Sequence, residues 1–324
     1  MTRARRGRAI HEGLVGERAL IGQPYLRDPD LRREYAEDIA PRTEVALAKI
    51  LRAVFATCGG EPIRVLDLGA GTGAAAVAVR AFFAPATEVV SVDRVAGPGI
   101  VVADLGAPGP LRGVAGRFDV IVAAHLLNEL YVHESVPRRV AARADRVRTW
   151  IEAFLAPGGT MVIVEPALRD TSRELLAVRD QLVAAGLRVV APCLWAGPCP
   201  ALARERDWCH DGALEPSDVV GQRARRVDFS YLALRTTGPA ASDPTLFRVV
   251  SDPLVEKGRL RLFGCGPAGR DALVRLDRHR TVANAAFDQL ERGDLVRIRE
   301  TAAAGDGRRI LGETSVERLT GPAT

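Results

Sequence analysis

The sequence has no apolar run as long as the roughly 20 residues that a membrane-spanning helix requires, and its first residues lack the apolar core of a secretory signal. We therefore expect neither a membrane partner nor export. The five cysteines would then lie in a reducing compartment. In such a compartment, clustered cysteines are more often metal ligands than disulfides.

Lysine is almost absent, and arginine carries nearly all of the positive charge behind a net charge of +5. Arginine binds phosphate groups through two parallel hydrogen bonds, so the composition is compatible with a nucleic-acid partner. Arginine that merely replaces lysine in a GC-rich coding sequence explains the charge equally well. Two groups of arginines are candidates for a basic surface, one along a helical segment and one beside the cysteines: Arg138, Arg139, Arg143, Arg146 and Arg148, and Arg204, Arg206, Arg259 and Arg261.

From residue 63 onward, short apolar segments alternate with segments of helical periodicity. Strands that are separated by helices form parallel sheets with both faces covered. Seven strands, the last two joined by an insertion, match the Rossmann-like α/β sheet of class I methyltransferases, whose last strand is usually antiparallel. The predicted strands are residues 63–71, 88–94, 99–105, 118–127, 160–166, 187–192 and 229–236.

A glycine-rich turn follows the first predicted strand in the segment VLDLGAGTG. Glycine leaves room where a ligand approaches the backbone, and Asp93 ends the second strand, where a carboxylate can bind both hydroxyls of a ribose. A nicotinamide dinucleotide would fit the same layout. Asp67 inside the first strand and Asp104 at the end of the third favour S-adenosylmethionine (SAM). The predicted SAM-binding residues are Asp67, Gly69, Ala70, Gly71, Gly73, Asp93, Asp104 and Leu105.

The segment HLLNEL follows the fourth predicted strand, whose end faces the methyl group of SAM in this fold. His125, Asn128 and Glu129 are therefore candidate catalytic residues. A helix-capping role for Glu129 and a core role for His125 are the structural alternatives. The N-P-P-[YF] motif of amino-directed nucleic-acid methyltransferases is missing, as is the cysteine pair used for cytosine C5 methylation. We therefore expect direct in-line transfer, with placement supplying much of the rate.

Four cysteines form a second candidate site: Cys193, Cys199, Cys209 and Cys265. Thiolates suit zinc or an iron–sulfur cluster. The tight C-x2–4-C pairs of zinc ribbons are missing, so the wide spacing favours a [4Fe–4S] cluster over zinc but leaves both open. The C-x3-C-x2-C signature of radical SAM enzymes is also missing, which argues against radical chemistry.

These patterns divide the chain into four parts. A helical region precedes the methyltransferase domain, which contains the cysteine-bearing insertion between its sixth and seventh strands. A small β-rich appendix follows and closes the metal site, and turn-forming residues predict a flexible tail. The boundaries are 1–58, 59–240 with the insertion at 193–228, 245–300 and 301–324.

Six motifs occur in this order along the chain: VLDLGAGTG, NEL, VIVEP, the cysteine segment V-V-A-P-C-x5-C-P-x7-W-C-H, FSYLAL and G-x-L-x-L-x-x-C. Over roughly residues 20–300 the chain resembles the methyltransferase-like family associated with assembly of the mitochondrial small ribosomal subunit, and its bacterial relatives. The resemblance implies SAM binding, a [4Fe–4S] cluster held by the four cysteines, and action on small-subunit rRNA or its precursor particle rather than on DNA. It also implies a cytoplasmic protein in bacteria or a mitochondrial one in eukaryotes.

Three functions remain open at this point. The first is a SAM-binding, iron–sulfur protein that methylates small-subunit rRNA or only assists assembly. The second is a SAM-dependent methyltransferase of a small metabolite, which a closed apolar pocket over the methyl group would favour. The third is a non-catalytic assembly factor with a vestigial SAM site, which calorimetry with SAM would identify. The sequence predicts no oligomeric state.

Overall fold

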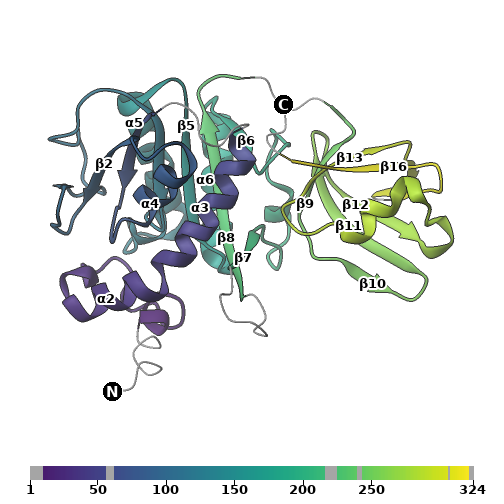
Figure 1. The fold of residues 1–324 in the computed structure, drawn as a ribbon, viewed down its shortest axis with the longest axis horizontal. Coiled ribbons are helices and arrows are strands. Elements are labelled where there is room, and N and C mark those ends of the chain that lie inside the picture. Colours follow the sequence, from purple (N-terminus) through teal and green to yellow (C-terminus); the bar gives the residue numbers. More distant parts are fainter. Residues whose placement is uncertain (1–9, 56–61, 216–224, 239–242, 306, 321–324) are drawn as a thin grey trace.

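The computed structural model describes residues 10–55, 62–215, 225–238, 243–305 and 307–320. These residues form a larger body around one sheet and a smaller body around a second sheet (Figure 1). The N-terminal segment lies against the lower side of the larger body in this view.

The first sheet has the strand order β3-β2-β1-β4-β5-β8-β6, and β7 also pairs with β8. Strands β1 to β5 run parallel to one another, whereas β8 is antiparallel to both β5 and β6. This order is that of a class I SAM-dependent methyltransferase, which confirms the predicted fold class. The strands are β1 (Arg64–Leu68), β2 (Glu88–Asp93), β3 (Ile100–Val102), β4 (Phe118–Ala124), β5 (Leu155–Pro166), β6 (Arg188–Ala191), β7 (Asp211–Glu215) and β8 (Arg225–Arg235).

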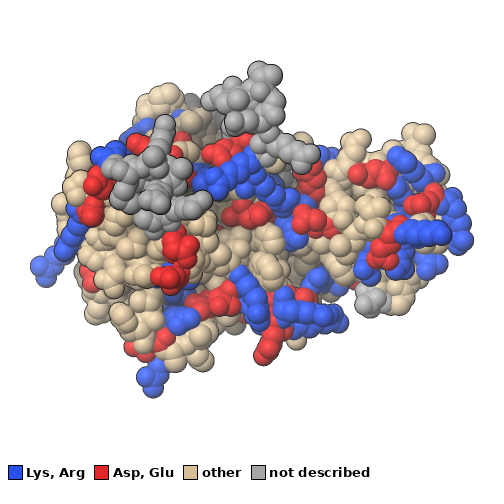
Figure 2. All heavy atoms as spheres, turned by 90° about the horizontal axis from the view of Figure 1, so that it is seen from below, with Lys and Arg blue, Asp and Glu red and all other residues tan. Residues whose placement is uncertain are grey.

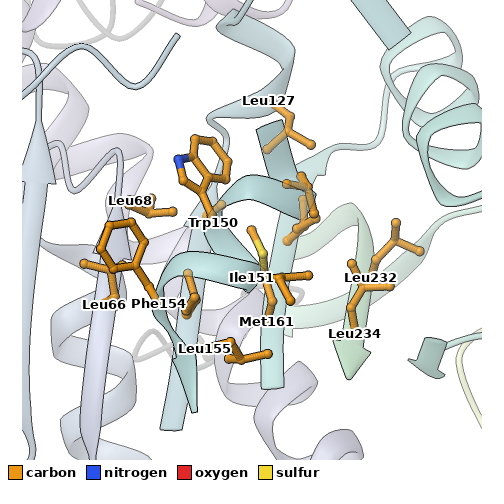
Figure 3. Close-up of a cluster of buried hydrophobic side chains, with 14 of the residues drawn as sticks. Leu66, Leu68, Leu127, Trp150, Ile151, Phe154, Leu155, Met161, Leu232 and Leu234 are labelled. Atoms are coloured by element: carbon orange, nitrogen blue, oxygen red, sulfur yellow. The ribbon is translucent and has the colours of Figure 1, made fainter. Parts of the chain in front are cut away.

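Helices cover both faces of this sheet because successive strand residues point to opposite sides. Leu66 and Leu68 face α5 (Val136–Phe154) and α6 (Arg169–Ala184), while Val65 packs with α3 (Ala40–Val54) and α4 (Ala74–Phe82). Figure 3 shows the first of these clusters, where Trp150 and Phe154 of α5 lie against the strand side chains.

The N-terminal segment is part of the larger body rather than a separate unit. It contains the short 3-10 helix η1 (Tyr25–Arg27) and α2 (Pro29–Asp38), followed by α3. Asp28 caps α2, since its Oδ1 accepts hydrogen bonds from the amides of Asp30 at 2.8 Å and Leu31 at 3.2 Å. Helix α3 buries its apolar side on the sheet. The predicted N-terminal helical region therefore contributes a layer that packs on the methyltransferase domain.

The second sheet has the order β14-β15-β12-β11-β9-β13-β16, with β10 beside β11. Its buried side chains include Phe247, Leu262 and Val296, and they pack with Phe287 of the 3-10 segment η5 (Val282–Gln289). The strands are β9 (Leu246–Val249), β10 (Leu254–Glu256), β11 (Arg259–Gly266), β12 (Gly269–Leu276), β13 (Leu295–Arg299), β14 (Ala302–Ala304), β15 (Gly307–Ile310) and β16 (Ser315–Leu319).

The C-terminal part of this smaller body differs from the sequence-based expectation. Residues 302–304, 307–310 and 315–319, expected as part of a flexible tail, form β14, β15 and β16, because Ile310 and Val316 join the buried cluster of the second sheet. The 3-10 segment η5 has a kink at Asn284. The side-chain amide of Asn284 donates to the carbonyl oxygens of His279 and Leu311 instead of facing solvent.

The cysteine-bearing insertion links the two bodies. It contains η3 (Pro200–Ala203) and β7, while the expected residues 216–224 lie outside the described ranges. The Arg270 guanidinium of β12 pairs with Asp207 of the insertion at 3.1 Å. The Arg248 Nε of β9 donates to the carbonyl oxygen of Pro192 at 3.2 Å. Both contacts hold the smaller body beside the end of β6.

Candidate functional site

The loop between β1 and α4 folds back onto the end of β2. The amides of Gly69 and Ala70 both donate to the carbonyl oxygen of Val92, at 2.8 and 3.1 Å. Gly69 has a φ of 76°, which a residue with a side chain rarely adopts. A Cβ there would also lie 3.1 Å from the Leu126 side chain. The glycine is therefore needed both for the turn and for the approach of the segment after β4.

The Asp93 carboxylate, at the end of β2, holds the same loop in place. Its Oδ2 accepts from the Gly71 amide at 2.9 Å, and its Oδ1 accepts from the Val95 amide at 2.8 Å. Each oxygen thus has one donor and keeps a lone pair for a further one. This is the arrangement that a carboxylate needs to bind a pair of neighbouring hydroxyl groups.

A cavity opens over this loop, with about 620 Å³ of space that is partly open to solvent. We call it the glycine-loop cavity. Five of the predicted SAM-binding residues line it: Gly69, Gly71, Asp93, Asp104 and Leu105. The remaining three, Asp67, Ala70 and Gly73, belong to the strand and loop beside it and do not contribute to its lining.

Asp67 lies beneath the cavity inside β1 and is almost fully buried. Its Oδ2 has no hydrogen-bond partner. Burial, and then the charge of Asp93, raise the pKa of Asp67 to about 7. A buried carboxyl without a full set of partners costs free energy, so a cationic or hydrogen-bond-donating ligand above the loop would stabilise its ionised form.

Residues of the N-terminal segment form the opposite wall of the glycine-loop cavity. They include Gln23, Tyr25, Leu26 and Tyr35. No motif marks these residues in the sequence. The only available signal is that two of the four tyrosines lie in this segment, in a chain with few aromatic residues.

His125 follows β4 and takes a φ of 56°, a left-handed conformation that histidine adopts more readily than most residues. Its amide donates to the Val164 carbonyl oxygen at 2.7 Å, which holds the turn against β5. Burial lowers the pKa of His125 to about 4, so the imidazole is neutral near pH 7. Its Nδ1 is buried without a hydrogen-bond partner.

Asn128 and the short 3-10 helix η2 (Leu127–Glu129) are fixed from below by Glu165 at the end of β5. The Glu165 carboxylate accepts from the amides of Leu127 at 2.8 Å and Asn128 at 3.3 Å. The Asn128 side chain donates to the His125 carbonyl oxygen and accepts from Arg18 Nη2, both at 3.0 Å. These contacts give Asn128 a role in shaping the turn, and its catalytic role stays a prediction.

Glu129 faces the N-terminal segment. Its carboxylate accepts from the Tyr25 hydroxyl at 3.0 Å and from the Arg94 guanidinium at 3.2 Å. Burial raises the pKa of Glu129 to about 7, against the opposing charge of Arg94. A carboxyl that titrates near neutral pH can accept or release a proton during a reaction, so the geometry is compatible with the predicted role.

A second cavity, which we call the N-terminal cavity, adjoins the first and encloses about 1100 Å³ of space that is partly open to solvent. Four residues line both cavities: Tyr25, Tyr35, His125 and Glu129. Most of its other lining side chains are apolar and come from the N-terminal segment, the turn after β5 and the start of β8.

All four predicted cysteine ligands line a third cavity, between the two bodies, with about 880 Å³ of partly open space. Cys193 follows β6, Cys199 precedes η3, Cys209 precedes β7, and Cys265 comes from β11 of the second sheet. All four are free thiols that are partly exposed. The fold therefore brings together thiols that are far apart in the sequence.

Burial and the neighbouring thiols both disfavour thiolates in this cysteine cavity. Burial, followed by the charges of Cys193 and Cys199, raises the pKa of Cys265 to about 12. Burial also raises the pKa of Cys209, followed by the charge of Cys265. Thiolates are therefore disfavoured in this cavity without a compensating positive charge.

Three arginines also line the cysteine cavity: Arg179, Arg248 and Arg270. Arg248 is buried, and one of its terminal nitrogens, Nη2, has no hydrogen-bond partner. Buried arginines around a cavity favour an anionic occupant. Within the described residues, however, no group of three or more His, Cys, Asp or Glu side chains is placed to hold a single metal ion.

The arginines predicted to line one helix face do not form a basic surface. Arg143 and Arg146 of α5 are buried. Arg143 donates to the carbonyl oxygens of Asn128 and Leu130, and Arg146 to that of Leu105. Arg143 also pairs with Glu174. These two side chains therefore hold the loops after β3 and β4, because their guanidinium groups satisfy carbonyl oxygens that no strand or helix pairs.

The strand order and the glycine loop define a methyltransferase-like protein of class I. Residues 33–279 match the family described as mitochondrial small ribosomal subunit Rsm22, and the chain belongs to this family. No curated protein matches the chain. Within the described residues, no helix is both long and apolar enough to cross a membrane.

Solved structures of several methyltransferases are similar over much of the chain. The N-methyltransferase NodS from Bradyrhizobium japonicum, bound to S-adenosylhomocysteine (SAH), is 17% identical with a TM-score of 0.39, covering 66% of this chain and 95% of its own. The plantazolicin methyltransferase BpumL with SAH is 14% identical with a TM-score of 0.39, covering 72% and 100%. Fibrillarin from Aeropyrum pernix with SAM is 17% identical with a TM-score of 0.34, covering 60% and 76%. At these TM-scores, the fold assignment depends on the strand topology described above.

Proposed function

We propose that the protein binds SAM and an iron–sulfur cluster and acts on small-subunit rRNA or on an assembly intermediate of the small ribosomal subunit. The observation that carries the proposal is the glycine-loop cavity, with Asp93 poised at its floor in a chain of the Rsm22 family. The ribosomal part of the proposal rests on the family alone.

For SAM, Gly69 and Gly71 would allow the ligand to approach the backbone, and Asp93 would bind the ribose hydroxyls. Asp104 has one carboxylate oxygen engaged by the Gly106 amide at 2.9 Å, which leaves the other for the adenine amino group. Asp67, Ala70 and Gly73 would support the loop from behind. SAM would supply an electrophilic methyl group.

The residues of this chain would then place the acceptor. The turn from His125 to Glu129 separates the two adjoining cavities. A neutral His125 can accept a hydrogen bond from the N–H or O–H of the group that is methylated. Glu129, with a pKa near 7, can take up a proton from it. Tyr25 and Tyr35 would exclude water from the same space. Because placement alone can supply much of the rate, no further catalytic group is required.

For the metal centre, the donor set fits thiolate chemistry. Cys193, Cys199, Cys209 and Cys265 would be the ligands of a [4Fe–4S] cluster. A single zinc ion, with Zn–S bonds of about 2.3 Å, requires its four sulfur atoms to be in mutual contact. A cluster places its own iron and sulfide atoms between the thiolates, so it does not require the four sulfur atoms to touch one another. Zinc remains the less favoured occupant.

SAM binding is tested by calorimetry on the full chain. We expect saturable binding in the wild type and at least a tenfold loss in Asp93→Ala, because the ribose would lose a charge-assisted pair of hydrogen bonds. Asp145→Ala is the matched control, since this carboxylate on α5 is exposed and contacts only Arg148. Absence of SAM binding in the wild type would leave only the third function, a scaffold for assembly.

Binding to the ribosomal substrate is tested with small-subunit precursor particles and their rRNA. We expect binding that weakens steeply with added salt, as phosphate contacts dictate. Transfer of labelled methyl groups to the rRNA would establish catalysis. If the protein binds neither the precursor particles nor their rRNA at low salt, the ribosomal proposal is wrong.

One observation favours the second function, methylation of a small metabolite. The N-terminal cavity is lined mainly by apolar side chains and adjoins the glycine-loop cavity, as an enclosed acceptor site would. The choice between a metabolite and RNA therefore depends on which chemical groups this cavity recognises.

A further inference from the structure

The N-terminal cavity occupies the place where a methyl acceptor has to lie. Its floor contains His125 at the end of β4 and Pro166 at the end of β5. Ligands of open α/β sheets bind outside the carboxyl ends of the strands. The cavity also shares Tyr25 and Glu129 with the glycine-loop cavity, so a group bound in it would lie next to the ligand of that loop.

The walls of the cavity suit a flat ring. Tyr25 and Tyr35 lie on the side of the N-terminal segment, with ring centroids 6.2 Å apart, and Phe229 of β8 also contributes to the lining. Aromatic side chains stack on unpaired bases, and enzymes that modify a base take it out of the stack into such a pocket. Aliphatic residues complete the lining: Leu14, Val15, Ile21, Ile39 and Leu168.

An arginine lies on one side of the same cavity. Arg42 lines it, and among the described residues its side chain has no hydrogen bond or ion pair, while its amide donates to the Ile39 carbonyl oxygen. Burial and then the charge of Arg225 lower the pKa of Arg42, and the charges of Glu215 and Asp38 act in the opposite direction. The one acidic residue of β8 in the lining, Asp228, is held by Arg226 at 2.6 Å. An arginine side chain without a direct ion-pair partner can bind an anion such as phosphate.

The face of the molecule that carries the N-terminal segment is seen in Figure 2. Lys and Arg gather there in separate groups, with Asp and Glu between them. The charge on this face is therefore patchy, which favours a few defined phosphate contacts over a continuous track for a long duplex.

Polar groups that could form hydrogen bonds with the edge of a base are present at the floor of the N-terminal cavity. The Nδ1 of His125 is buried and has no partner, and the neutral ring can accept a hydrogen bond. Glu129 lies next to it with its carboxylate already ordered by Tyr25 and Arg94. A hydrophobic pocket with a few fixed polar groups is the usual form of a specific ligand site.

We infer that the N-terminal cavity receives one unstacked base of single-stranded RNA, with its 5′-phosphate bound by Arg42. This inference rests on the proposed function, because it assigns the acceptor site of the same methyltransferase-like centre. A base still paired within a duplex could not enter, so the target nucleotide lies in a loop or is flipped out.

The test uses the full chain saturated with SAH. The probes are the four ribonucleoside 5′-monophosphates and the four corresponding nucleosides, and their binding is followed by calorimetry and saturation-transfer NMR. We expect at least one monophosphate to bind, and its nucleoside to bind about tenfold more weakly because it lacks the charge-assisted phosphate contact. Arg42→Ala should bring the monophosphate to the affinity of its nucleoside.

Two further variants keep the test decisive. Arg52→Ala is the matched control, because Arg52 lies on the same helix, is exposed and, among the described residues, contacts only the Ala48 carbonyl oxygen. It should leave every affinity unchanged. Ala167→Trp should fill the cavity and abolish nucleotide binding while SAH affinity stays normal, since Ala167 does not line the glycine-loop cavity.

The outcomes separate this inference from the function on which it rests. If SAH binds normally but no monophosphate binds, or if Arg42→Ala and Ala167→Trp retain wild-type nucleotide affinity, the acceptor-site inference is overturned. Failure of SAH to bind would instead remove the SAM function. Binding of nucleotides in that case, lost in Ala167→Trp, would still support the cavity as a base site.

Discussion

At the residue scale, Cys199 offers the most direct test of the metal centre. In Cys199→Ser we expect the iron content of anaerobically purified protein to fall from about four per chain toward zero, with loss of brown colour. The melting temperature should fall with it, because ligation energy is part of folding energy. Iron analysis, visible absorption spectra and thermal unfolding would measure these changes.

The matched control for that substitution is Cys58→Ser. Cys58 lies outside the described residues and outside the cysteine motifs, and we expect its substitution to leave iron bound. Zinc in equal amount to the protein, without iron, would refute the cluster while retaining the four ligands. Iron that survives in Cys199→Ser would remove this residue from the ligand set.

A second prediction at this scale concerns buried carboxyls. Burial raises the pKa of Asp67, Glu129 and Glu165 to about 7 each. The folded state therefore holds these protons more tightly than the unfolded chain. Their contribution to stability is complete below the ordinary carboxyl pKa, near pH 4.5, and is lost as the pH rises through about 7.

Glu129→Gln removes one of the three titrations. We expect the free energy of unfolding of the wild type to fall between pH 5 and pH 8, and the slope to be shallower in the variant. The difference across this range should be at most about 3 kcal/mol. Urea unfolding at several pH values measures both slopes. Equal slopes would show that Glu129 titrates alike in the folded and unfolded chains.

At the element scale, helix α5 depends on Trp150, which is buried against the first sheet (Figure 3). Trp150→Ala should destabilise the protein by about 3–5 kcal/mol, because it leaves a large cavity between helix and strands. Val77→Ala on α4 is the control, since Val77 is 53% exposed and should change stability by less than about 0.5 kcal/mol. Urea unfolding compares the two, and a small effect of Trp150→Ala would mean that the site collapses around the deletion.

The elements differ in how far the sequence predicted them. The turn at Gly69 and Gly71 was predictable because strand, glycines and helix are adjacent in the chain. Strands β14 to β16 were not, since their residues are held by pairing with β12 and β13, which no local pattern reports. The place of Tyr25 and Tyr35 in the cavity walls was also not predictable, because the N-terminal segment packs on residues that are distant in the sequence. Helical periodicity predicts a helix but not the surface on which it packs.

At the scale of the whole molecule, the cysteine cavity lies between the two bodies, because Cys265 belongs to the second sheet, whereas the other three thiols lie between β6 and β7 of the first. Removing iron with a chelator should therefore speed proteolytic cleavage between β8 and β9. Other contacts also span the junction among the described residues, including the Arg270–Asp207 pair and the packing of Leu194 with Leu246 and Leu295. Limited proteolysis followed by mass spectrometry measures the rate and the site of cleavage.

The control for that experiment is the same chelator applied to Cys199→Ser, in which no acceleration is expected because the metal is already absent. Cleavage of the wild type at an unchanged rate would show that the side-chain contacts between the two bodies hold the junction without the metal. The cluster would then have no part in joining the two bodies.

The position of the fourth thiol has a consequence for biosynthesis. A chain emerging from the ribosome presents Cys193, Cys199 and Cys209 before residue 265 and the strands around it have been made. A centre that requires all four cannot be completed during early synthesis. Metal loading would then be completed only in chains that have been translated beyond residue 265 and have brought both sheets together.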